Sequence, residues 1–309
     1  MICEIAPAKI NLTLEIINKR ADGYHELNSI MQTIDLCDVL TFWENDWINV
    51  IPEYFNLPSE DTLAEFDSNN YLNNNLVYKA ASLLKEETGY GGGALIQLRK
   101  NIPSAAGLGG GSSDAAATLK GLNKLWKLGL SRDELSKIGS KIGSDVSYFI
   151  YGGTCFVKGK GEIVIPLKAL PTKWLIVILI PLNIRQKTEK LYSFINPSHY
   201  SNGDSTRFIL EKIDDWGNNN NNNRAGSSPG EDINDYLVNV FEIVYNNKIR
   251  EFEEWQKYFE RMKINPLHLA GSGPAVYYIS DSEVDVKRVV DNNLAKFNNL
   301  RKYIARTVP

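Results

Sequence analysis

One run of small residues has the composition of a phosphate-binding loop. Gly107-Leu-Gly-Gly-Gly-Ser-Ser113 follows a strand-like segment, Ala94 to Arg99, and leads into a helix expected over Ser112 to Leu128. Glycines let successive backbone N–H groups turn toward one point without Cβ obstruction. The helix behind them adds the positive end of its dipole. The pattern predicts a cradle for a triphosphate, with two serine hydroxyls available to phosphate or to a metal ion.

Two other phosphate loops do not fit this run. A dinucleotide fingerprint lies near a first strand and needs an acidic residue about 20 positions later, whereas a Walker loop ends in Gly-Lys-Ser/Thr. No lysine follows the glycines here. A flexible turn is the bland alternative, but four glycines beside two serines at a helix start favour the cradle. The function class that the run favours is an ATP-dependent small-molecule kinase.

Phosphoryl transfer also needs a cation near the transferring group and a base for the acceptor hydroxyl. Lys9, in Ala6-Pro-Ala-Lys-Ile-Asn-Leu12, is the candidate cation, although by itself it could be a surface lysine. Asp145, in Ile142-Gly-Ser-Asp-Val-Ser-Tyr-Phe149, is the candidate base, although it could equally form a helix end or a turn. The residues alone leave both alternatives open.

Three separated blocks together resemble the three motifs of the GHMP kinases, a family that includes galactokinase, homoserine kinase and mevalonate kinase. They are Pro7 to Leu12, Pro103 to Ser113 with the alanines that follow, and Leu269-Ala-Gly-Ser-Gly-Pro-Ala-Val276. They occur in the family's order and span nearly the whole chain. The resemblance implies a two-domain α+β fold, with an N-terminal ribosomal-S5-like α/β domain over 1–166 and a C-terminal ferredoxin-like α+β domain over 167–309.

The first block continues into Lys19-Arg-Ala-Asp-Gly-Tyr-His-Glu-Leu27. This stretch is similar to one branch of the family, which phosphorylates a cytidyl-diphosphate-linked sugar alcohol on the route to isoprenoid precursors. Galactokinases and mevalonate kinases lack it. The resemblance therefore implies a small-molecule acceptor with a cytosine group. ATP would be the phosphoryl donor, bound as its Mg2+ complex.

The resemblance assigns roles to residues of this sequence. It makes Asp145 the catalytic base and Lys9 its partner, with no residue named as a metal ligand. The ATP-binding residues are Pro103, Ser104, Ala105, Ala106, Gly107, Leu108, Gly109, Gly110, Gly111, Ser112 and Ser113. The substrate-binding residues are Asn11, Tyr24, His25, Thr188, Gly271, Ser272 and Gly273, of which Tyr24 can stack on cytosine and His25 can hydrogen-bond its edge.

One departure and two alternatives accompany this interpretation. The family commonly has proline where this chain has Ser147, which could loosen the turn that carries Asp145. One alternative is a GHMP kinase for homoserine, mevalonate or a sugar, although such enzymes lack the Asp-Gly-Tyr-His stretch. The other is a non-catalytic nucleotide sensor with the same fold. The presence of both Lys9 and Asp145 argues against a sensor.

The elements that must position these residues follow from periodicity and turn residues. Strands are expected at 2–5, 10–17, 30–42, 94–99 and 174–180, the last of them buried on both faces. Helices are expected at 75–88, 112–128, from Ser131 with a capping box to Glu134, and near 187–195, 232–246 and 248–262. A strand-loop-strand is expected over 267–279, then a helix and a final strand. Residues 52–73 suggest a long loop, and the asparagine-rich stretch near 214–231 suggests a solvated insertion.

Composition narrows the partners and the compartment. The 309 residues carry a formal net charge of −3, which argues against general binding to nucleic acid or to an anionic membrane. The longest apolar run is seven residues, Trp174 to Ile180, and a bilayer needs about 20. We see no signal peptide, and three cysteines without CxxC spacing suggest reduced thiols. These features predict a cytoplasmic enzyme, and a monomer or a homodimer is expected.

Overall fold

The computed structural model describes residues 1–54, 75–182, 188–219, 233–295, 297 and 300–309. Helices and strands are mixed without strict βαβ alternation, which is an α+β arrangement. The chain forms two compact units that interleave along the sequence. The first unit comprises 1–8, 36–104 and 109–152, and the second comprises 9–35, 105–108 and 153–309. A domain boundary at 166 and 167 stays a prediction, since no single cut separates these units.

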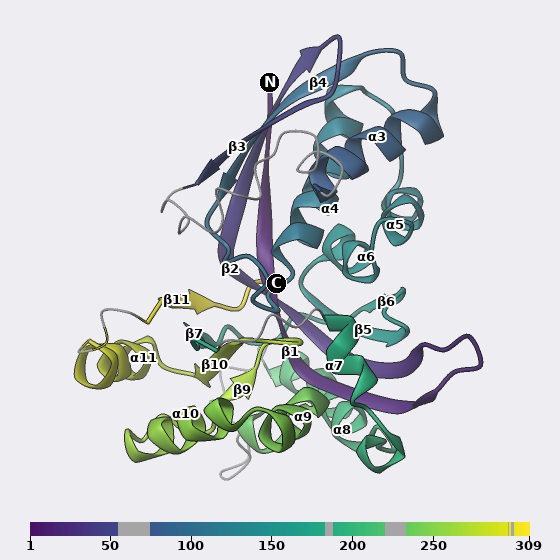
Figure 1. The fold of residues 1–309 in the computed structure, drawn as a ribbon. Helices are drawn as coiled ribbons and strands as arrows, with labels where there is room; N and C mark the ends of the chain where they lie inside the picture. The colour runs from purple at the N-terminus through teal and green to yellow at the C-terminus, as the bar shows by residue number, and fades with distance from the viewer. Residues whose placement is uncertain (55–74, 183–187, 220–232, 296, 298–299) are drawn as a thin grey trace. The chain divides into compact units, whose positions relative to one another are not determined.

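The first unit is a sheet with helices on one side of it (Figure 1). Its elements are the start of β1 (Ile2–Lys19), the second half of β2 (His25–Asn45), β3 (Asn49–Tyr54), β4 (Gly93–Lys100), α3 (Leu76–Thr88), α4 (Gly110–Leu125), α5 (Arg132–Ser140) and α6 (Ser144–Tyr151). Strand β4 pairs antiparallel with β2 and parallel with β3. Helix α4 packs closely on β2, because a Cβ added to Gly121 would lie 2.5 Å from the Phe42 ring.

The second unit contains an antiparallel sheet in the order β11-β7-β10-β9. The strands are β7 (Trp174–Leu179), β9 (His268–Leu269), β10 (Ala275–Ser280) and β11 (Lys302–Arg306), with β5 (Thr154–Gly159), β6 (Ile163–Pro166) and β8 (Val238–Asn239) elsewhere in the unit. The helices are α7 (Thr188–Ser193), α8 (Asp204–Asn219), α9 (Val240–Lys248), α10 (Arg250–Arg261) and α11 (Glu283–Val289). Residues 175–178 of β7 are fully buried, which confirms a strand covered on both faces.

Several predicted boundaries are confirmed by their capping chemistry. Helix α3 begins after Asn75, whose side chain accepts a hydrogen bond from the Val77 N–H, and ends at Gly89 with a φ of 67°. Helix α5 begins at the predicted capping box, in which Ser131 and Glu134 bond each other's backbone N–H groups. These ends are local in origin, so sequence is enough to predict them.

Other elements differ from the prediction. The helix expected over 232–246 is a short turn (Ile233–Tyr236), then β8, and α9 begins only at Val240, because the Asn239 side chain caps the Phe241 N–H. Helix α8 was not expected, and it extends into the asparagine run as far as Asn219. The remaining part of that run, like most of the expected loop over 52–73, lies outside the described residues; 52–54 complete β3.

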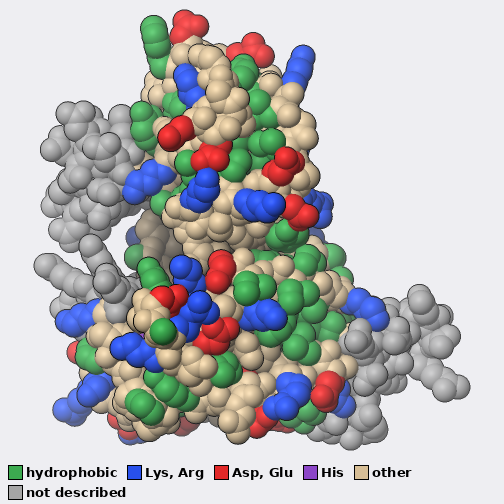
Figure 2. Space-filling view, turned by 90° about the vertical axis from the view of Figure 1, so that its right-hand side faces the viewer, with side chains coloured by type: hydrophobic (Ala, Val, Ile, Leu, Met, Phe, Trp, Pro, Cys, Tyr) green, Lys and Arg blue, Asp and Glu red, His purple; other side chains and the backbone are tan. Residues whose placement is uncertain are grey.

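Two surface properties bear on partners. Figure 2 shows basic and acidic side chains interspersed on the face drawn there, so neither sign of charge dominates it. Within the described part of the chain, no helix is long and apolar enough to cross a membrane.

Candidate active site

Lys9 is a buried residue of β1, with 4% of its surface exposed. Its Nζ donates a 2.6 Å hydrogen bond to Asn11 Oδ1, and Asn11 Nδ2 donates one of 2.8 Å to Ser29 Oγ. The Tyr277 hydroxyl donates a further bond, of 2.8 Å, to the Asn11 carbonyl oxygen. Burial excludes the alternative of a surface lysine, since an ammonium group is taken out of water only with polar partners. The hydrogen bonds from Lys9 to Asn11 and from Asn11 to Ser29 therefore orient the Lys9 ammonium group.

The first half of the glycine run lies against two other predicted segments within the second unit. The Lys9 N–H donates a 3.0 Å hydrogen bond to the Leu108 carbonyl, and the Ala275 N–H donates one of 3.1 Å to the Ala106 carbonyl. Gly107 has a φ of 82°, and a Cβ there would lie 2.0 Å from the Ala270 oxygen. The fold thus brings together the three blocks that sequence inspection singled out separately.

Gly271 completes this convergence. A Cβ at Gly271 would lie 2.6 Å from the Gly107 oxygen and 2.8 Å from Lys9 Nζ. Only residues without side chains allow the two loops to approach each other and the ammonium group so closely. A cradle that an added Cβ would fill is the geometry that phosphate groups require of a protein backbone.

The second half of the run turns into α4 in the first unit. Gly109 has a φ of 73° and is the N-cap, so the helix begins at Gly110, two residues earlier than expected. Ser113 is 1% exposed, and its hydroxyl has no hydrogen-bond partner among the residues described. Ser112 is half-buried. The free N–H groups of this first helical turn, with the dipole behind them, fit an anionic phosphate.

A buried charge cluster, which the sequence did not predict, anchors both ends of the run. Asp38 Oδ1 accepts hydrogen bonds from the N–H groups of Asn101 and Ile102. Lys100 Nζ bridges Asp38 Oδ2 and Asp114 Oδ2, the latter at 2.7 Å. Asp38 lies within strand β2 and Asp114 is the fifth residue of α4, so the available signal was a charged residue at positions expected to be buried. The cluster ties the end of β4 to the start of α4.

Burial shifts the pKa values of the charged groups in this cluster. Desolvation raises the pKa of Asp114, against the opposing charge of Lys100. Burial lowers the pKa of Lys100, but its two carboxylate neighbours outweigh that effect and the net shift is upward. Asp114 Oδ1 has no hydrogen-bond partner in the part of the chain that is described.

Asp145 is the second residue of α6 in the first unit and is half-buried. The next residues, Val146 and Ser147, are buried. Ser147 Oγ donates a 3.1 Å hydrogen bond to the Ser136 carbonyl of α5. The serine that replaces the family's proline therefore fastens the start of α6 to α5. Lys9, the other catalytic candidate, belongs to the second unit.

The Arg-x-Asp-Gly-Tyr-His stretch forms the tip between β1 and β2. The Arg20 N–H donates a 2.8 Å bond to the Tyr24 carbonyl, and Gly23 has a φ of 88°. The Arg20 side chain pairs with Asp22 at 3.2 Å and Glu26 at 2.6 Å. These contacts give the charged residues of the stretch a structural role, which is to shape the turn that presents the aromatic pair.

The two aromatic residues of this tip differ in solvent exposure: Tyr24 is exposed, whereas His25 is half-buried. Tyr24 is 58% exposed, with Lys160 Nζ 4.7 Å from its ring centroid. His25 stacks on Tyr192 at 5.6 Å and meets Tyr200 edge-on at 6.5 Å. Burial, and then Lys19, lower the pKa of His25. Its Nε2 is buried and has no hydrogen-bond partner within the described ranges, which argues against a satisfied structural histidine.

Thr188, another of the predicted substrate-binding residues, is described by its backbone alone. Thr188 begins α7, but its side chain lies outside the described residues. Tyr192, four residues later on the same helix, was not predicted as a site residue. Its Thr-x-x-x-Tyr spacing places it one helical turn from Thr188. It packs edge-on against Phe241 at 5.0 Å, which fixes its ring beside His25.

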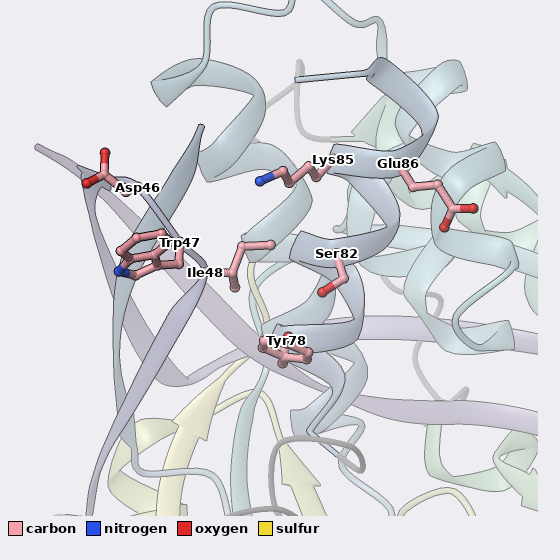
Figure 3. Close-up of a pocket in the computed structure, with 7 residues that line it drawn as sticks. All are labelled: Asp46, Trp47, Ile48, Tyr78, Ser82, Lys85 and Glu86. Atoms are coloured by element: carbon pink, nitrogen blue, oxygen red, sulfur yellow. The ribbon is translucent and has the colours of Figure 1, made fainter. Parts of the chain in front are cut away.

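A separate hollow of about 440 Å³ occurs in the first unit. It lies between the β2–β3 turn and α3 (Figure 3), and it is lined by Asp46, Trp47, Ile48, Tyr78, Ser82, Lys85 and Glu86. None of the predicted site residues lines it. The hollow is therefore not the site that the motifs define.

Comparison with known proteins decides the family. Residues 75–153 match the family model described as GHMP kinases N terminal domain. A curated 4-diphosphocytidyl-2-C-methyl-D-erythritol kinase from Geobacillus thermodenitrificans is 37% identical over 303 residues, which cover 96% of this chain and 92% of that protein. The chain belongs to the 4-diphosphocytidyl-2-C-methyl-D-erythritol kinase family of GHMP kinases. The expected enzyme class, an ATP-dependent kinase, is confirmed.

Solved structures agree with membership in this kinase family. A crystal structure of 4-(cytidine 5'-diphospho)-2C-methyl-D-erythritol kinase superposes with a TM-score of 0.76 at 27% identity, covering 99% of each chain. A crystal structure of mevalonate kinase superposes with a TM-score of 0.68 at 18% identity, also over 99% of each chain, and shows a likeness of fold alone. The two-domain α+β GHMP kinase fold is confirmed.

Proposed function

We propose that this kinase transfers the γ-phosphoryl group of ATP to the 2-hydroxyl of 4-diphosphocytidyl-2-C-methyl-D-erythritol. The products are the 2-phosphate and ADP, in the methylerythritol phosphate route to isopentenyl diphosphate. The observation that carries the proposal is the aromatic group at the β1–β2 tip. His25, held against Tyr192, presents a buried nitrogen that has no hydrogen-bond partner among the described residues, and Tyr24 presents an exposed ring. A nucleobase offers a π-face and a hydrogen-bonding edge that match them.

The nucleotide half of the proposal rests on the glycine run. Residues Pro103 to Ser113 would hold ATP, with its phosphates over the backbone N–H groups of Gly107 to Ser113. The positive φ values at Gly107 and Gly109 and the helix N-terminus at Gly110 support this role. Mg2+ would arrive as the ATP complex and neutralise charge on the phosphates. Gly271, Ser272 and Gly273 would shape the region where acceptor and phosphate meet.

The chemical step needs two side chains with opposite roles. Asp145 would accept the proton of the acceptor hydroxyl as that oxygen forms its bond to the γ-phosphorus, while the bond to ADP breaks in line. The proton is then released from Asp145 to water. Lys9, oriented by Asn11, would offset the negative charge that develops during transfer. Thr188 and Asn11 would contribute to acceptor binding.

Acceptor choice is the test. Purified full-length protein would be given Mg-ATP with the cytidyl-erythritol acceptor, homoserine, mevalonate or galactose in turn, and ADP release measured. We expect ADP with the cytidyl acceptor alone, and a phosphate on its 2-oxygen by phosphorus NMR. Release with another acceptor would favour another GHMP activity. Release with none would favour the nucleotide sensor.

The proposal also covers the class of partner, the cellular compartment and the oligomeric state. The formal net charge of −3 and the mixed charges on the face in Figure 2 suit small-molecule substrates rather than nucleic acid. We place the enzyme in the cytoplasm, as a monomer or homodimer.

A further inference from the structure

One face of α9 makes hydrogen bonds to the backbone of the loop that precedes β10. Asn239, Glu242 and Tyr245 are spaced three residues apart, so their side chains lie on one side of the helix and its cap. Asn239 Nδ2 donates to the carbonyl oxygens of Leu269 and Gly271, both at 2.8 Å. We call these three side chains the α9 clamp.

The other two clamp residues bond neighbouring backbone groups. Glu242 Oε1 accepts a 2.7 Å hydrogen bond from the Leu269 N–H. The Tyr245 hydroxyl donates one of 2.7 Å to the Ser272 carbonyl. The backbone groups outside α9 that the clamp bonds therefore lie within residues 269–272, immediately before or inside the third glycine loop, Gly271 to Gly273. A loop held by three side chains from one rigid helix has little freedom to change shape.

Glu242 bonds the loop where a capping box would have it bond the backbone of the N-cap residue. Asn239-x-x-Glu242 has the spacing of a capping box, in which the glutamate would bond the N-cap backbone. Asn239 does cap the helix, because its Oδ1 accepts from the Phe241 N–H at 3.0 Å. Glu242, however, bonds the loop instead. Asn239 is 5% and Tyr245 1% exposed, so an unmet partner on the loop would remain buried and costly.

The clamped loop in turn limits the position of the glycine run. A Cβ at Gly107 would lie 2.0 Å from the Ala270 oxygen and 2.7 Å from the Gly273 nitrogen. The two backbones are therefore in close contact, with no room for a side chain between them, so a movement of one loop toward the other is sterically opposed. All these residues belong to the second unit, so this chain of contacts runs through one compact body.

We propose that Asn239, Glu242 and Tyr245 are positioning residues that fix the third glycine loop and, through its contact with Gly107, the phosphate-binding backbone. The inference rests on the proposed function, because it takes these two loops to hold the reacting phosphate and the acceptor. Each of the three acts through its hydrogen bonds to the loop.

Conservative variants separate positioning from stability. Tyr245→Phe removes one hydroxyl. Asn239→Asp keeps the oxygen that accepts from the Phe241 N–H and so keeps the helix cap. It replaces the amide donor by an oxygen, which cannot hydrogen-bond the carbonyls of Leu269 and Gly271. Glu242→Ala loses the acceptor that Glu242→Gln keeps. Tyr258→Phe is the matched control, since its ring packs on Phe259 and Phe297 in α10 and the segment after α11, away from the loop.

Kinetics, ADP affinity and melting temperature are measured for each variant. We expect Tyr245→Phe, Asn239→Asp and Glu242→Ala to lower kcat/KM and ADP affinity about tenfold, while Glu242→Gln and Tyr258→Phe stay within about threefold of the wild type. Clamp variants that melt at lower temperature but match Tyr258→Phe in kinetics and ADP binding would overturn the proposal.

Calorimetric binding of ADP, without any acceptor, keeps the two proposals distinguishable. If the wild type does not use the cytidyl acceptor but the clamp variants still weaken ADP binding, the positioning role is supported and the proposed function is wrong. If the wild type phosphorylates that acceptor and the clamp variants match the wild type in kinetics and ADP affinity, the positioning role is wrong and the proposed function is supported.

Discussion

Gly107 approaches Ala270 so closely that a Cβ on Gly107 would lie 2.0 Å from the Ala270 carbonyl oxygen. The contact joins the second and third blocks of the family, which lie far apart in the sequence. It leaves no room for any side chain, and the φ of 82° independently favours glycine. Two separate physical reasons thus require glycine at this position.

Gly107→Ala should abolish most turnover, because the methyl group must push the two loops apart. We expect a loss of kcat/KM of at least about 100-fold, measured by ADP release. Gly129→Ala is the matched control. It has a similar φ of 70° but nothing within 4 Å of the added Cβ. That variant should pay only the backbone strain, about 1 kcal/mol of unfolding free energy, and keep its activity. Equal activity in both variants would contradict the steric explanation.

Asp145→Ala should lower kcat by about 1,000-fold, the usual scale of general-base catalysis. ADP affinity should change little, since the base acts on the acceptor. Asp133→Ala supplies the control, because Asp133 is likewise the second residue of its helix, α5, and its exposed carboxylate accepts a 2.7 Å hydrogen bond from the Tyr151 hydroxyl. Near wild-type turnover of Asp145→Ala would rule out its assignment as base.

Tyr24→Ala should raise KM for the cytidyl acceptor about tenfold and leave KM for ATP nearly unchanged. The expected loss corresponds to a base–aromatic stacking contact of about 1–3 kcal/mol. Steady-state kinetics with each substrate varied in turn would measure both constants. Trp47→Ala removes another exposed aromatic side chain, in the hollow of Figure 3, and should change neither KM. An unchanged acceptor KM for Tyr24→Ala would exclude stacking.

Lys100→Met should destabilise the protein by about 3 kcal/mol, because it leaves two buried carboxylates without their cation. Adding Asp114→Asn to Lys100→Met should recover part of that loss, since one uncompensated charge is removed. Urea unfolding would measure both. The exposed pair of Lys141 with Glu87 gives the control: Lys141→Met should cost less than about 1 kcal/mol. Similar losses for the two lysines would contradict a stabilising cluster.

Glu242 should give the unfolding free energy a defined pH dependence. Burial raises the pKa of its carboxyl to about 7, whereas an unfolded glutamate titrates near about 4.3. Between these values the native state binds the proton more tightly. The contribution of Glu242 to stability is therefore full below about pH 4.3 and lost as pH rises to about 7.

The measurement compares wild type with Glu242→Gln, which cannot titrate, by urea unfolding from about pH 4 to 8. Wild-type stability relative to the variant should fall across the window and be level above it. His268 Nδ1 lies 4.0 Å from the carboxylate, and Tyr277, whose pKa is raised by burial and then by Glu242, also faces the group. Both residues are present in wild type and variant. Exposed Glu251→Gln is the control. A rising or level difference would contradict the assignment.

The sequence by itself determined what depends on neighbouring residues. The capping box at Ser131, the helix end at Gly89 and the buried strand of 174–180 are local patterns, and the structure has all three. The three family blocks and the Asp-Gly-Tyr-His stretch likewise predicted the enzyme class and the fold. The roles of the individual site residues and the domain boundary stay predictions.

Tertiary structure alone decided which residues surround those motifs. Lys9 could be distinguished from a surface lysine only by its burial beside Asn11 and Ser29. The Asp38–Lys100 pair and the α9 clamp join residues distant in the chain, and their partners are often backbone atoms. A backbone carbonyl or N–H group is present at nearly every position, so no residue type in the sequence marks where such a contact will form.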